Sequence, residues 1–202
     1  MNIHQEILAK SEQNGHVCLY QHLKNVADTA RVMAKHLGFD EQIAVEGALL
    51  HDIGKVSPVF QQSLISPNKK KKPGAVFRHE IASLFFLSLV CQEHRDAVID
   101  MIVAHHKSMY RDVRNLGILD LDDASDCFEE HSKLFPEWSH IAIDILESLG
   151  LETHEVSLEE AEENYEYVID YCDGRKKGCS EWRGLLMAAD HMASAMETAF
   201  EM

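Results

Sequence analysis

An adjacent histidine and aspartate, His51 and Asp52, stand at the end of an apolar run, and Gly54 then interrupts the helical pattern. An imidazole nitrogen and a carboxylate oxygen together suit a divalent transition metal, or a magnesium or manganese site. Burying such a pair at the end of an apolar helix costs free energy unless both groups find partners. A lone pair of this kind is more often an aspartate that orients a core histidine, so a metal site requires further ligands from elsewhere in the chain.

Further candidate ligands lie on the buried stripe, or near the end, of other predicted helices, and they are His22, His79, His105, His106 and Asp190. With His51 and Asp52 they exceed what one tetrahedral metal needs. Two ions that share one carboxylate would use all seven, with the His51–Asp52 pair at the centre. Two ions about 3.5–4 Å apart can activate a hydroxide and neutralise charge on a phosphodiester during hydrolysis.

Helical periodicity and capping residues predict the elements that must bring these side chains together. The chain has only 4 Pro and 10 Gly and few alternating runs, which predicts an all-α fold, a single-domain helical bundle over residues 1–202. In a bundle, side chains from several helices can converge on one interior pocket. The expected helices are 19–37, 41–52, 58–65, 77–90, 94–107, 136–149, 158–172 and one that begins after Ser180.

The net charge of -15 would ordinarily disfavour a polyanionic substrate, but the charge is unevenly distributed. Residues 120–170 hold 17 acidic and one basic side chain, whereas residues 1–119, with most of the candidate ligands, are close to neutral. We therefore expect the acidic segment to face away from the pocket or to dock onto a protein partner. Four lysines at 69–72 form either a solvated loop or an arm that contacts phosphate.

Several classes of protein are disfavoured by the sequence. Five scattered cysteines argue against a disulfide framework and favour a reducing cytoplasm. No apolar run has the length of a membrane span, the first residues do not resemble a signal peptide, and no membrane partner is expected. The chain lacks a Gly-x-x-x-x-Gly-Lys-Ser/Thr phosphate loop and a Gly-x-Ser-x-Gly motif, which disfavours ATP hydrolysis by the phosphate-loop route.

The order H…HD…H…HH…D resembles that of the HD superfamily of metal-dependent phosphohydrolases. Four stretches are similar to the CRISPR-associated HD nuclease: His51–Lys55 (HDIGK), Arg78–Glu80 (RHE), His105-His106 and Ala189–Ser194 (ADHMAS). In type I CRISPR systems that nuclease is part of a helicase–nuclease that degrades DNA after target recognition. The resemblance covers roughly residues 16–200 and implies a helical bundle of the HD-domain type.

The resemblance implies a role for each matching residue. His22, His51, Asp52 and Asp190 would hold a first metal, and Asp52 would bridge to a second metal completed by His79, His105 and His106. Lys55 would stabilise charge at the scissile phosphate, with a surface or salt-bridge role as the alternative, and Lys107 and Ser194 would contact substrate. The implied reaction is hydrolysis of single-stranded DNA by a metal-bound hydroxide, with two ions of Mn, Ni, Co, Fe or Mg. The implied partners are single-stranded DNA and a CRISPR helicase, fused or separate, that links the chain to the target-recognition complex.

One departure from the family pattern leaves alternatives open. No helicase sequence follows Met202, so the chain is either a stand-alone nuclease subunit or a piece of a longer protein. A second interpretation is an HD phosphohydrolase that acts on a small nucleotide, which needs only His22, His51, Asp52 and Asp190. A third is a non-catalytic HD scaffold that binds a partner through its acidic face.

Overall fold

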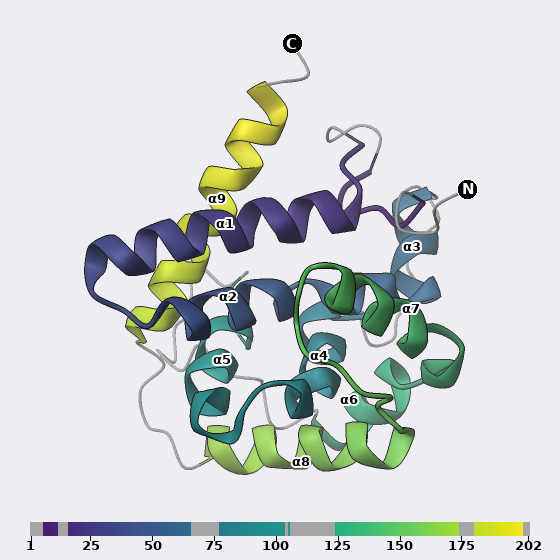
Figure 1. Ribbon diagram of the computed structural model, residues 1–202. Helices are drawn as coiled ribbons and strands as arrows, with labels where there is room; N and C mark the ends of the chain where they lie inside the picture. The colour runs from purple at the N-terminus through teal and green to yellow at the C-terminus, as the bar shows by residue number, and fades with distance from the viewer. Residues whose placement is uncertain are drawn as a thin grey trace, which may run out of the picture.

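The computed structural model of the chain describes residues 6–11, 16–65, 77–103, 105, 124–173 and 180–199, with the backbone alone given at 124–127. The described residues form helices, and their one β feature is an isolated antiparallel bridge between Leu8 and Cys18. The expected all-α fold is confirmed (Figure 1). The domain limits 1–202 stay a prediction.

The described helices follow in chain order. They are α1 (Leu19–Leu37), α2 (Glu41–Leu50), the 3-10 helix η3 (Ile53–Val56), α3 (Pro58–Ile65), α4 (His79–Ser83), the 3-10 helices η4 (Leu84–Leu89) and η5 (Gln92–His94), α5 (Arg95–Ile102), α6 (Ala124–His131), α7 (Phe135–Ser148), α8 (Leu158–Asp173) and α9 (Glu181–Ala199).

The first two helices form as local sequence rules require. Apolar residues three and four apart give α1 a buried stripe, and Gly38, at φ +77°, ends the helix in the left-handed region that favours glycine. The side chain of Asp40 caps α2 by accepting hydrogen bonds from the backbone N–H groups of Gln42 (2.8 Å) and Ile43 (3.1 Å). α1 packs against both α2 and α9 (Figure 1).

The expected continuous helix over 77–90 is wrong in part. An α-helix spans only His79–Ser83, and a 3-10 helix with a non-helical Phe86 follows it. Every residue from Leu84 to Leu87 is fully buried, so the run has no solvent face and carries no helical periodicity that would require a regular helix. Tertiary packing therefore sets the backbone conformation of this run.

The expected helix over 94–107 also differs from the structure. The α-helix is Arg95–Ile102, preceded by the 3-10 helix Gln92–His94, and His105 lies in a turn beyond its end. The helix predicted to reach Asp52 ends at Leu50, because Asp52 has already left helical geometry, at φ -117° and ψ 3°. His105 and the His51–Asp52 pair therefore lie in turns beyond the ends of their helices.

Buried aromatic residues of η4 and α7 form a cluster in the core. Phe85, Phe86, Phe135 and Trp138 are fully buried, with ring centroids of Phe135 and Trp138 5.1 Å apart. α8 packs along η4, where the side-chain amide of Asn164 donates to the backbone oxygen of Phe85 at 2.9 Å.

Among the helices that the structure describes, none combines the length and hydropathy needed to cross a bilayer.

A close approach at Gly54 brings η3 against α4. The backbone N–H of Gly54 donates to Ser83 Oγ at 2.9 Å, and that hydroxyl donates to the backbone oxygen of His51 at 3.0 Å. A Cβ atom on Gly54 would collide with the backbone oxygen of His79 and would lie 2.7 Å from the backbone nitrogen of Ser83. Only glycine allows this contact, which sets the distance between the His51–Asp52 turn and His79.

We expect Gly54→Ala to lower the free energy of unfolding by about 3 kcal/mol, the upper end of the range for overpacked sites, because backbone atoms must move apart. Urea unfolding would measure the change. Gly184→Ala is the matched control, since nothing lies within 4 Å of a Cβ there, and it should stabilise α9 by up to about 1 kcal/mol. A Gly54→Ala protein as stable as the wild type would contradict the close approach.

Candidate metal centre

The carboxylate of Asp52 lies at the centre of four imidazole rings. Its Oδ1 atom is 3.0 Å from His79 Nε2 and 3.6 Å from His105 Nε2. Its Oδ2 atom is 3.2 Å from His22 Nε2 and 3.3 Å from His51 Nε2. Each oxygen therefore faces two ring nitrogens, and all five residues are buried or nearly so.

These side chains come from separate elements, as the sequence predicted they must. His22 lies on the buried stripe of α1, and His51 and Asp52 occupy the turn between α2 and η3. His79 is the first residue of α4, and His105 follows α5. The structure thus brings together five of the seven candidate ligands at one buried place.

Backbone hydrogen bonds set the tautomer of two of the rings. A carbonyl oxygen only accepts, so His51 Nδ1 donates to the oxygen of Ala48 at 2.6 Å, and His105 Nδ1 donates to the oxygen of Ile102 at 2.7 Å. In the neutral ring, Nε2 then presents a lone pair toward Asp52. His51 Nε2 is buried and makes no hydrogen bond, although it lies 3.3 Å from the carboxylate. A lone pair that faces a carboxylate is unfavourable unless a cation lies between them.

The donor atoms fall into two triplets that share Asp52. His22, His51 and Asp52 form one, and Asp52, His79 and His105 form the other, with the ligand atoms of each triplet within 4.8 Å of one another. Two imidazoles and a carboxylate are a donor set that transition metals accept. The chemistry of the donors and the orphaned nitrogen of His51 therefore fit bound divalent metal.

Of the remaining predicted site residues, the structure describes Asp190 and Ser194. Asp190, on α9, has its Oδ1 atom 3.5 Å from His22 Nε2, and Ser194 Oγ donates to the same oxygen at 3.2 Å. Asp190 lies beside the first triplet without joining it as a member of a mutually close set. His106 and Lys107, like the lysines at 69–72, lie outside the described residues. The ligand role of each residue stays a prediction.

Lys55 lies inside the site. Its Nζ atom donates to Asp52 Oδ2 at 2.5 Å, and the residue is only 8 % exposed. The ammonium also lies 5.8 Å from the centre of the Phe60 ring. The salt-bridge alternative that the sequence left open therefore describes the contact that Lys55 makes here.

The protonation states follow from burial and from these neighbours. Burial raises the pKa of Asp52, but the neighbouring His51 and Lys55 outweigh it and hold that pKa well below its usual value. Burial lowers the pKa of His79 more than Asp52 raises it, which leaves this ring neutral at pH 7. Burial also lowers the pKa of His22, but hydrogen bonds to Asp52 and Glu197 outweigh it and raise the pKa to about 9.

Glu197 is a residue near the site that the sequence did not single out. Its carboxylate lies 3.1 Å from His22 Nδ1, on the side of the ring away from Asp52. It stands seven residues after Asp190 on α9, which places both on one face of that helix. This i, i+7 spacing from a candidate ligand was the available signal.

A family model described as "HD domain" matches residues 19–160, more than half of the chain. The match covers His22, the His51–Asp52 pair, His79 and His105, and it ends before α9, so Asp190 is placed beside the site by the structure alone. No curated protein and no solved structure matches the chain.

We expect metal binding to release protons in a pH-dependent way. In the ion-free protein, charged His22 contributes stability that is complete below pH 6.5 and is lost as the pH rises through about 9. A cation at His22 Nε2 must displace that proton, so affinity for Mn²⁺ should rise from pH 7 to 9.

Calorimetry of Mn²⁺ binding in buffers of different ionisation enthalpy measures this release. We expect about one proton per chain from His22 at pH 7.5, and fewer at pH 9.5. The variant His22→Gln should lack this pH-dependent component. Binding of Mn²⁺ at pH 7.5 without any proton release would contradict the assignment.

Proposed function

This chain belongs to the HD domain family, and we propose that it is a two-metal nuclease that hydrolyses phosphodiester bonds of single-stranded DNA. The family and the His/Asp clusters indicate a metal-dependent phosphohydrolase. The observation that carries the finer proposal is the pair of triplets that share Asp52, since a shared carboxylate is what a two-ion site requires.

In this proposal the residues divide between two ions. His22, His51 and Asp190 hold the first ion, His79, His105 and His106 hold the second, and Asp52 is shared. Two such ions supply Lewis acidity to the attacking water and offset charge on the phosphodiester. The preponderance of imidazole favours Mn, Ni, Co or Fe over Mg, because magnesium prefers oxygen ligands.

Lys55 has a defined part in the proposal. Its ammonium is buried and pairs with the same Asp52 oxygen that faces His22 and His51. When cations satisfy Asp52, Lys55 becomes available to stabilise charge on a phosphate oxygen. Ser194 holds Asp190 through its hydrogen bond, and Lys107 is proposed to contact substrate.

The substrate and the cellular setting are inferred from sequence motifs. Single-stranded DNA, a CRISPR helicase, the target-recognition complex beyond it and a cytoplasmic location are supported by the similarity of four sequence motifs to the CRISPR-associated nuclease. The charge distribution is compatible, because the acidity is concentrated in residues 120–170, where exposed glutamates of α8 lie opposite its η4-packed face. Duplex DNA would require the helicase partner.

We expect the chain to cleave circular single-stranded DNA with Mn²⁺, Ni²⁺, Co²⁺ or Mg²⁺, and Asp52→Asn to reduce the rate by more than about 100-fold. Loss of a residue that merely orients a ligand costs about 10–100-fold, so loss of the shared ligand should exceed that. Asp28→Asn, an exposed aspartate on α1 paired with Lys24, is the matched control and should retain full activity. Absence of cleavage with all four metals would refute the nuclease.

A second candidate is a one-ion phosphohydrolase that acts on a small nucleotide. It is favoured by the first triplet, which together with the neighbouring Asp190 forms a four-residue set without His79 or His105. Metal analysis of the purified chain separates the two candidates. One ion per chain, with nucleotide hydrolysis and no DNA cleavage, would establish the second.

A further inference from the structure

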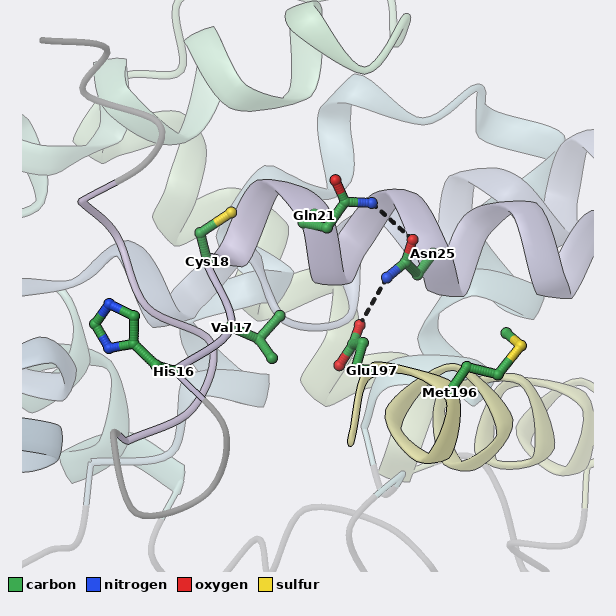
Figure 2. Close-up of a pocket in the computed structure, with 7 residues that line it drawn as sticks. All are labelled: His16, Val17, Cys18, Gln21, Asn25, Met196 and Glu197. Atoms are coloured by element: carbon green, nitrogen blue, oxygen red, sulfur yellow. Dashed lines mark hydrogen bonds between the residues drawn. The ribbon is translucent and has the colours of Figure 1, made fainter. Parts of the chain in front are cut away.

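The Glu197 carboxylate is contacted by nitrogen atoms of three side chains. Lys10 Nζ donates to it at 2.8 Å and Asn25 Nδ2 at 3.0 Å, and His22 Nδ1 lies 3.1 Å away. The side chain of Glu197 is 5 % exposed. Figure 2 shows it beside Asn25, at the edge of a cavity of about 510 Å³ that His16 also lines. Neither Lys10 nor Glu197 lies within the part of the chain that matches the family model.

This contact determines which nitrogen of His22 keeps its proton. An ionised carboxylate only accepts, so His22 Nδ1 must donate to Glu197. The other nitrogen, Nε2, faces Asp52 at 3.2 Å and Asp190 at 3.5 Å. A cation at the first triplet therefore meets Nε2, while the proton on Nδ1 stays with Glu197.

We propose that Glu197 is a positioning residue for the metal centre. It fixes the tautomer and the ring orientation of His22, so that Nε2 binds the ion of the first triplet together with Asp52. The inference rests on the proposed two-metal site. His51 and His105 are oriented by backbone oxygens, whereas His22 is oriented by a charged group from α9. A carboxylate is the stronger acceptor and makes the imidazole a better ligand.

Lys10 and Asn25 support this role. They satisfy the remaining acceptor capacity of Glu197 and offset the cost of burying its charge. An amide at position 197 would lose that charge and could not accept from all three donors through its single oxygen. Glu197→Gln therefore removes the function of the carboxylate with little change of volume.

The test is a titration with Mn²⁺, comparing wild type, Glu197→Gln and Glu46→Gln. Glu46 is the matched control because its side chain is similarly buried, at 8 % exposed, and accepts from His94 Nδ1 at 2.7 Å, a histidine outside both triplets. We expect Glu197→Gln to weaken one of two Mn²⁺ ions by about 10–100-fold and to leave the other unchanged. Glu46→Gln should bind both ions as the wild type does.

Two results would overturn the inference while leaving the proposed function intact. These are unchanged Mn²⁺ affinity in Glu197→Gln, and an equal loss in Glu46→Gln. A wild-type chain that binds no Mn²⁺ would remove the proposed function, and the role of Glu197 with it.

A second measurement on the wild type does not depend on the folding of any variant. Nitrogen-15 NMR of the histidine rings in the protein loaded with Zn²⁺, used as a diamagnetic probe, reports the tautomer of His22. We expect a proton on Nδ1 and metal on Nε2. Metal on Nδ1, or a proton on Nε2, would overturn the inference.

Discussion

The buried carboxylate of Asp52 is the charge around which the structure is arranged. It is 1 % exposed, and removing a charge from water costs several kcal/mol unless partners repay it. Lys55 repays part of this cost. In their neutral forms, however, the rings of His51 and His105, each held through Nδ1 by a carbonyl oxygen, turn a nitrogen lone pair toward the same carboxylate. A proton or a metal ion between these groups makes them favourable neighbours, and this set of imidazole and carboxylate donors is suited to bound metal.

The backbone serves this arrangement through turns and close contacts. His51 and His105 lie just beyond the end of an α-helix, where each ring donates to a carbonyl oxygen of the last turn, and Asp52 directly follows His51. Gly54 lets η3 approach α4 closely enough for Asp52 to meet His79. α9 packs against α1 and places Asp190 and Glu197 beside His22.

The sequence predicted those elements whose limits are set locally. The bounds of α1 follow from its apolar stripe and Gly38, and the start of α3 follows from Pro58 at its first position. The prediction of one continuous helix over 77–90 was wrong in part, because a fully buried run carries no periodic pattern of apolar and polar residues. The four histidines around Asp52 were singled out by residue type, but Glu197 was not, because its contact with His22 spans 175 positions. Such a partner is determined by packing of α9 on α1, which no local pattern records.

In the proposed metal centre, Asp52 is shared by two cations. Anomalous diffraction from crystals grown with Mn²⁺ would test it most directly, since each ion gives a separate peak. We expect two peaks about 3.5–4 Å apart, one beside His22 and His51 and the other beside His79 and His105. A single peak, or peaks away from Asp52, would contradict it.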